Sequence, residues 1–424
     1  MAREGRMFAS LHLHNYRCFF IGAIISNIGL WMFRIAQDWL ILTDLTDRSS
    51  SALGVATALQ FLPLPLLAPF AGALADRYPK RWLLVGTQIL LGINALVLGV
   101  LVASGIVELW MVYLSAFLGG VMAALDNPAR QAFVSEMVPT RLLPNAVGLN
   151  ATTFNSARLI GPGVAGLIIG AWGVAPAMFI NGFSYLAALI ALWAMRPGEL
   201  NPAPQRKGRG AVREGIDYVR GRPDIVLVLV IVFMLGTFGM NFQLSNAVMA
   251  TRAFGKGAEE FGALGSIMAI GTLAAALIAA RRTRPRIGVI LGALAGFSVS
   301  SGLLALAPTY PIYALLLIPT GLFALTVLTS ANSTVQLATE PAFRGRVMAL
   351  YMAIFLGGTP IGSPVIGWIG DVFGPRWTLA VGSIATGLTF AVATAYVVRT
   401  RQLPVQMASA GEDAGLTVDR VDEA

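Results

Sequence analysis

Twelve long apolar stretches fill the chain between Cys18 and Val398, and charged residues are nearly confined to the joints between them. Each stretch is long enough for an α-helix to cross a hydrocarbon core of about 30 Å. Only 12% of the residues are charged, whereas soluble domains carry about 25%. The pattern predicts an all-α, polytopic membrane protein with twelve spans, at 18–42, 52–75, 82–104, 109–133, 142–171, 174–195, 224–250, 260–280, 287–307, 311–337, 347–370 and 376–398.

Basic residues collect on one side of these predicted spans, in the N-terminus, in alternate loops and in the tail. The exceptions among the 30 Lys and Arg residues are Arg48, Arg252, Lys256 and Arg376 in the opposite loops, and Arg34 and Arg158 inside spans. Because cytoplasmic loops are enriched in Lys and Arg, we expect both termini in the cytoplasm and the protein in the cytoplasmic membrane. The pI of about 10.1 then reflects topology and membrane lipid rather than nucleic acid.

A polar stretch at 196–223 divides the spans into two sets of six. Val212, Ile216 and Val219 recur there at helical spacing, which is typical of a short amphipathic helix at the membrane interface. We therefore expect five regions: a cytoplasmic N-terminus at 1–17, a six-helix bundle at 18–195, the cytoplasmic linker at 196–223, a second six-helix bundle at 224–398 and a cytoplasmic tail at 399–424.

The two halves resemble each other in sequence. Residues 160–173 (IGPGVAGLIIGAWG) and 361–374 (IGSPVIGWIGDVFG) align without gaps, and the matched segments are the fifth and eleventh spans. Paired six-helix halves with a binding site near the middle of the membrane are a transporter architecture. The sequence therefore predicts a duplicated fold rather than a single channel.

The loop after the second span reads GALADRYPKR from Gly72 to Arg81. It resembles the G-x-L-A-D-R-x-x-R/K-R signature of the major facilitator superfamily, and the resemblance implies that family's fold. A glycine at position 72 is expected to let two helices approach closely, and Asp76 to pair with a nearby cation. By the resemblance, a lock on the cytoplasmic gate would consist of Gly72, Asp76, Arg77, Lys80, Arg81 and Arg130.

A second pattern in the fifth span is similar to the G-x8-G-x3-G-P-x2-G-G motif of superfamily antiporters, with alanine at two of the glycine positions. The matching residues are Gly148, Ala157, Gly161, Pro162, Ala165 and Gly166. In that family the motif accompanies export, although small residues at this spacing also serve ordinary helix packing. DNPARQ at 126–131 and ARLIGP at 157–162 are similar to the bacterial exporters that include the enterobactin exporter and macrolide-efflux pumps.

Ionisable side chains inside a membrane are costly, so each one is a candidate for function. Arg158 lies near the middle of the fifth span and needs an anionic substrate or a permanent acidic partner, for which Asp126 and Asp38 are available. Asp38 is the preferred carrier of a coupling proton and Asp126 its competitor; an ion pair between Arg34 and Asp38 is the alternative. Many proton antiporters of the family carry an arginine in the fourth span, but residues 114–124 contain none.

Neutral polar side chains complete the predicted substrate site, which comprises Arg34, Gln60, Asn150, Asn155, Arg158, Asn241 and Gln243. We expect a monomer with a small-molecule substrate, a proton and membrane lipid as partners, and no cofactor or metal. The chain lacks the H-E-x-x-H, G-x-S-x-G and phosphate-loop motifs of enzymes. The function predicted is proton-driven export of a drug-like or siderophore-like compound by alternating access, and the alternative is proton-coupled import of a small nutrient.

Overall fold

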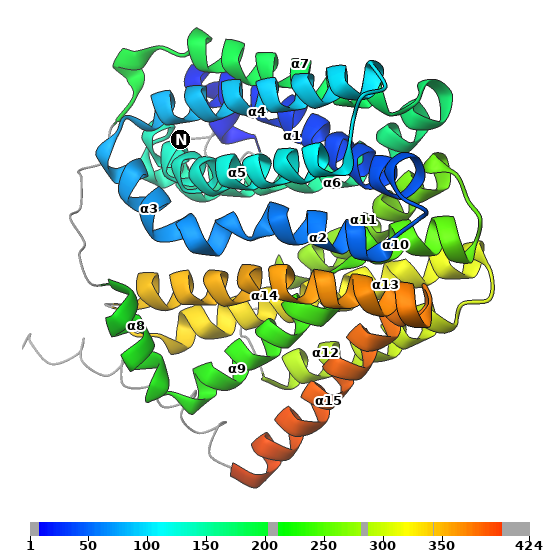
Figure 1. The fold of residues 1–424 in the computed structure, drawn as a ribbon. Helices are drawn as coiled ribbons and strands as arrows, with labels where there is room; N and C mark the ends of the chain where they lie inside the picture. The colour runs from blue at the N-terminus through cyan, green and yellow to red at the C-terminus, as the bar shows by residue number, and fades with distance from the viewer. Residues whose placement is uncertain (1–7, 202–210, 281–286, 342, 401–424) are drawn as a thin grey trace, which may run out of the picture.

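The computed structural model describes residues 8–201, 211–280, 287–341 and 343–400, and every regular element in this part of the chain is a helix (Figure 1). The first half contains η1 (Ala9–His12), α1 (His14–Leu40), η2 (Ile41–Leu45), α2 (Ser50–Phe61), α3 (Pro63–Arg77), α4 (Lys80–Ala103), α5 (Leu109–Met137), η3 (Thr140–Leu142), α6 (Leu143–Trp172) and α7 (Val174–Ala194). The second contains η4 (Pro197–Glu199), α8 (Ala211–Arg220), α9 (Pro223–Met234), η5 (Leu235–Gly239), α10 (Phe242–Val248), η6 (Met249–Ala253), α11 (Ala258–Ala280), α12 (Ile287–Leu306), α13 (Tyr310–Ala338), α14 (Arg344–Phe373) and α15 (Trp377–Thr400).

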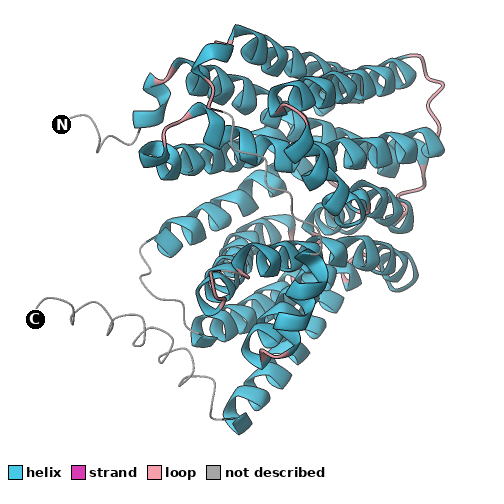
Figure 2. Cartoon of the chain, turned by 90° about the vertical axis from the view of Figure 1, so that its left-hand side faces the viewer, coloured by secondary structure: helices cyan, strands magenta, loops and turns pink. Residues whose placement is uncertain are grey.

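The helices form two bundles, here called the N-bundle (α1–α7) and the C-bundle (α9–α15), which lie one above the other in Figures 1 and 2. The first span begins at α1 and the last ends with α15 on the same side of the molecule, which we call the termini face; α8 lies there too. The opposite side, which holds the α1–α2 and α10–α11 connections, is called the far face. The all-α polytopic fold predicted from the sequence is confirmed.

Eleven stretches in the described part of the chain are long and apolar enough to cross a membrane. The remaining predicted span, the fifth at 142–171, corresponds to α6, which has 30 residues and one charged side chain, Arg158, but falls short on hydropathy. Asn150 and Asn155 also lie in its first half. This less apolar helix packs between α1 of its own bundle and α11 of the other, so much of its surface is shielded from lipid.

Large apolar side chains are exposed along the outside of both bundles, among them Leu66, Ile190, Leu277 and Val392. Water would penalise this surface by about 25 cal/mol for each Å² of apolar area. A hydrocarbon solvent removes that penalty, and it also requires that backbone groups be paired within each helix. The outside of the protein is thus suited to lipid.

The two bundles meet along two equivalent helix pairs, α6 with α11 and α14 with α2. A Cβ at Gly166 would collide with the first turn of α11, and a Cβ at Gly367, its counterpart in the duplicated sequence, would collide with the first turn of α2. The repeat seen in the sequence therefore places the same small residue at the same contact in each half. Replacing either glycine would push the bundles apart.

The predicted amphipathic helix of the linker is α8, which packs against α14. Tyr218 stacks on Phe343 with 4.6 Å between ring centroids, and Arg346 pairs with Glu214 at 2.5 Å. Residues 202–210 of the linker, 1–7 of the N-terminus and 401–424 of the tail lie outside the described residues.

Candidate functional site

Asp371, at the end of α14, joins the bundles at the far face. Its carboxylate accepts hydrogen bonds from the backbone N–H of Ser50 (2.8 Å) and Ser51 (2.9 Å) and from the hydroxyl of Ser49 (3.0 Å). The first N–H groups of a helix have no partner within it and favour a negative charge. A carboxylate of the C-bundle therefore caps the N-terminus of α2 in the N-bundle.

Arg252 completes this cluster, which we call the far-face clamp: Ser49, Ser50, Ser51, Arg252 and Asp371. The Arg252 guanidinium donates to Asp371 at 2.8 Å and to the Ser50 hydroxyl at 3.1 Å. Nearby, Arg48 donates to the carbonyl of Thr251 at 3.2 Å. The sequence marks Arg48 and Arg252 only as cations in the opposite loops. It gives no signal for Asp371, because nothing local links this residue to a helix start more than 300 residues away.

Asp38, near the end of α1, also contacts the C-bundle. Its Oδ2 accepts a hydrogen bond from Nε2 of Gln243 at 2.6 Å, and the neighbouring Trp39 ring stacks on Phe261 at 6.2 Å. Asp38 is buried. No ion pair joins it to Arg34 within 4.0 Å among the described residues, so the alternative of an Arg34–Asp38 pair is not realised in this structure.

Arg34 and Arg158 converge on the ring of Trp31. The guanidinium carbons lie 5.1 Å and 5.8 Å from the ring centroid, and that of Arg34 lies 5.7 Å from the Phe61 ring. Nε of Arg34 and Nε1 of Trp31 are buried without a hydrogen-bond partner. Arg158 is not paired with Asp126 or Asp38, since each of those carboxylates is bonded elsewhere.

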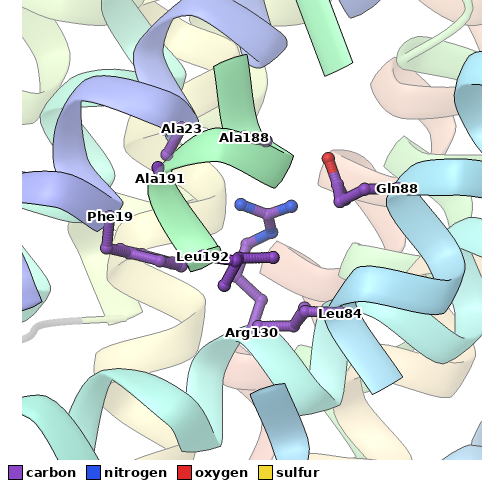
Figure 3. Close-up of a pocket in the computed structure, with 8 residues that line it drawn as sticks. All are labelled: Phe19, Ala23, Leu84, Gln88, Arg130, Ala188, Ala191 and Leu192. Carbon is purple, nitrogen blue, oxygen red and sulfur yellow. The ribbon is translucent and has the colours of Figure 1, made fainter. Parts of the chain in front are cut away.

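Asp126 belongs to a network inside the N-bundle. Its Oδ1 accepts from Thr87 (2.7 Å) and Gln88 (2.8 Å), and its Oδ2 accepts from Nε of Arg130 at 2.7 Å. A cavity of about 10 Å³ lies beside it, and Figure 3 shows Gln88 and Arg130 at its wall. That is about the size of one water molecule, and Oε1 of Gln88 is buried without a partner. The hydrogen bonds from Thr87 and Gln88 join α4 to α5, and the charged pair of Asp126 with Arg130 lies within α5.

The neutral members of the predicted site are placed differently. Asn155 donates to the carbonyl of Ala151 in its own helix at 2.8 Å, and Asn241 donates to Thr237 at 2.7 Å while its Oδ1 is buried without a partner. Gln60 and Asn150 are half-buried with no side-chain bond among the described contacts.

A pocket of about 320 Å³ opens between α13 and α14, lined by Leu328, Thr329, Asn332, Ser333, Tyr351, Met352 and Phe355.

The predicted gate residues whose side chains the structure describes have separate partners. Lys80 pairs with Glu136 at 2.8 Å, Arg81 donates to the carbonyl of Leu192 at 2.9 Å, and Arg130 is held by Asp126. Arg77 is exposed, with its guanidinium 5.8 Å from the Tyr78 ring. The side chain of Asp76 lies outside the described residues.

Close approach is not the role of every predicted glycine. A Cβ at Gly72 or Gly148 would meet no atom within 4 Å, so the expected tight packing is absent at these two positions. At Gly161, by contrast, a Cβ would lie 2.6 Å from the Cβ of Trp31, and Pro162 packs on Gly265 of α11. The antiporter-like segment is therefore closely packed in its second half, from Gly161 to Gly166.

Two duplicated helical bundles with buried charges between them define the class of protein as a membrane transporter of the major facilitator superfamily, and not an enzyme. Within that superfamily, the profile of the transmembrane secretion effector family matches residues 6–416, and the chain belongs to this family.

Two relatives with known names are similar over most of their length. The chain is 24% identical to the staphyloferrin A transporter of Staphylococcus aureus (strain NCTC 8325 / PS 47), covering 87% of this chain and 92% of the relative. It is 25% identical to the multidrug efflux pump Tap of Mycolicibacterium fortuitum, covering 90% and 95%. The crystal structure of a bacterial homologue of the human lysosomal transporter Spinster, inward-facing and unoccupied, superimposes with a TM-score of 0.68 at 15% identity, covering 92% and 97%.

Proposed function

We propose that the chain exports a drug-like or siderophore-like small molecule across the cytoplasmic membrane by alternating access, in exchange for protons. The observation that carries the proposal is where the bundles are bonded to each other. Every described hydrogen bond between them lies in the far half, from the far-face clamp to the bond that Ser266 donates to the carbonyl of Leu159 at 2.6 Å. With the termini in the cytoplasm, this is an arrangement closed to the outside.

Arg34 and Arg158, the charged groups without an acidic partner, lie beside two of these bonds between the bundles. Arg158 directly follows the Leu159–Ser266 contact toward the termini face, and Arg34 lies one helical turn from the Asp38–Gln243 bond. Transporters of this architecture bind substrate near the middle of the membrane, between the two halves. The efflux pump and siderophore transporter among the relatives agree with an exported compound of this size class.

Asp38 is assigned to the coupling proton. It is bonded to one neutral amide rather than to a cation. The amide of Gln243 donates to an ionised carboxylate and, when turned over, accepts from a protonated one. The site therefore accommodates both protonation states, whereas Asp126 accepts hydrogen bonds from the Arg130 guanidinium and from two further donors.

Direction and coupling are tested with everted membrane vesicles and reconstituted liposomes. A panel of drugs and siderophores, compared between deletion and overexpressing cells, first identifies a transported compound. Everted vesicles should then accumulate this compound as their imposed proton gradient collapses, whereas an importer would load right-side-out vesicles instead. Asp38→Asn should abolish substrate-driven proton movement; if it does not, and Asp126→Asn does, Asp126 is the carrier.

A further inference from the structure

Two cations and one aromatic ring form an unusual group beside the contact of α6 with α11 between the bundles. Arg34 comes from α1 and Arg158 from α6, and both face the Trp31 ring between them. The two guanidinium groups repel each other, and no carboxylate lies within ion-pair distance of either among the described residues. Both side chains are half-buried, so two partly shielded positive charges lie together without an acidic partner in the described part of the chain.

The nearby acids do not neutralise these arginines. Asp126 is bonded to Arg130 in the interior of the N-bundle. Asp38 is bonded to Gln243 and contributes only a longer-range attraction to Arg34. Two positive charges thus remain, partly shielded from solvent and without an acidic partner within ion-pair distance among the described residues.

Two hydrogen-bond donors in the same group also lack an acceptor. Nε of Arg34 and Nε1 of Trp31 are both buried and unpaired. Buried donors without partners are rare in native proteins, and each calls for an explanation. A carboxylate has two acceptor oxygens for the two unpaired donors, and its negative charge would offset one of the two positive charges.

An apolar surface adjoins the cations. Phe154 meets the Trp31 ring edge-on at 5.9 Å and is exposed, while Phe61 flanks Arg34. An anion that carries an aromatic or alkyl body could place its carboxylate between the arginines and its body against these rings. Inorganic anions would gain only the first of these interactions.

We propose that Arg34, Arg158 and Trp31 form a subsite for a carboxylate group of the cargo, so that the transported compound is an amphipathic organic acid. The subsite rests on the proposed function for its place in the transport cycle. Binding to it, however, does not depend on the direction of transport or on proton coupling.

The test measures binding to the purified full chain in lipid nanodiscs by isothermal titration calorimetry. Three probes are compared: 1-naphthylacetate, its neutral amide 1-naphthylacetamide, and inorganic phosphate. The acid should bind at least tenfold more tightly than the amide and than phosphate, because only the acid combines a carboxylate with an aromatic body. Equal affinity of acid and amide for the wild-type protein would overturn the subsite without any variant.

Variants then assign the residues. Arg158→Gln should weaken binding of 1-naphthylacetate about tenfold or more, in line with the strength of charge-assisted bidentate bonds. Trp31→Phe, which retains a ring but lacks the donor, should weaken it less, and Arg158→Lys should retain part of it. The matched control is Arg346→Gln on α14, where Arg346 is paired with Glu214. The affinity of this variant for 1-naphthylacetate should equal that of the wild-type protein.

The outcomes separate the subsite from the proposed function. Acid-selective binding that Arg158→Gln abolishes would support the subsite. If cells then show no efflux of any organic acid, the proposed export is contradicted while the subsite stands. Unchanged binding in a folded Arg158→Gln or Arg158→Lys protein removes the subsite, even if cells export drugs.

Discussion

Removing the carboxylate of Asp371 should open the far face. The change is Asp371→Ala, and it deletes three hydrogen bonds between the bundles, from Ser49, Ser50 and Ser51, which are 2.8–3.0 Å long. It also leaves the start of α2 without the partner that its first N–H groups have in this structure. Arg252 would lose its acidic partner as well.

The size of the effect follows from the exposure of the group. Hydrogen bonds to a charged acceptor contribute about 1.5–3 kcal/mol each when buried, but the Asp371 side chain is 28% exposed, so water replaces part of each. Loss of a helix cap costs about 1 kcal/mol. We therefore expect a total of about 3 kcal/mol against the arrangement seen here, which changes the ratio of closed to open far faces by on the order of 100-fold.

The measurement is the distance between spin labels on the two bundles by double electron–electron resonance. Labels at Ser104→Cys and Thr309→Cys are suitable, because both positions are exposed at the far face, and the native Cys18 is replaced by serine. Asp371→Ala should add a population at longer distance. The control is Glu260→Ala, also near the far face, because the described bonds of Glu260 remain within the C-bundle, to Gly257 and Lys256.

An unchanged distance distribution in Asp371→Ala, with the labels working in wild type, would refute this reasoning. It would show that helix packing along α2 and α14 holds the far face closed without help from the clamp. A shift of equal size in Glu260→Ala would refute it as well, since the effect would then come from a general loss of acidic charge.

Two further substitutions test the packing and the buried network. Gly262→Leu should disfavour the closed far face and slow transport, because a Cβ there would collide with the carbonyl of Pro162 across the bundles; transport at the wild-type rate would contradict this. Arg130→Gln should lower the thermal midpoint of the detergent-solubilised protein, since breaking a buried ion pair costs about 3–5 kcal/mol. Arg220→Gln, which removes an exposed pair with Asp217, should leave the midpoint unchanged.

The fold was predictable because each of its main features has a local cause. Span length, the polar linker and each copy of the glycine pattern can be read from a short contiguous stretch of sequence. The repeat also predicts which helices are equivalent, since α6 and α14 each pack against a helix of the other bundle. The weak point was α6, whose hydropathy is lowered by the polar residues at its site-facing half.

The site was less predictable because it depends on which charges are left over. The sequence offers two carboxylates for two arginines, and counting suggests that they cancel. In three dimensions Asp126 is paired with Arg130 in its own helix, four residues away, and Asp38 with an amide of the other bundle. Neither choice can be derived from spacing alone, since Arg34 is also four residues from Asp38.

The distribution of bonded and unbonded charges has a consequence for transport. The charges that are fully paired lie within the N-bundle, Asp126 with Arg130 inside α5 and Lys80 of α4 with Glu136 of α5, and can stay paired as the bundles rock. The clamp around Asp371 spans the two bundles and must break in each cycle. Arg34 and Arg158 have no partner to lose, so an anion bound there would add a new interaction without first breaking an old one. That is the energetic arrangement expected of a binding site that must load and unload repeatedly.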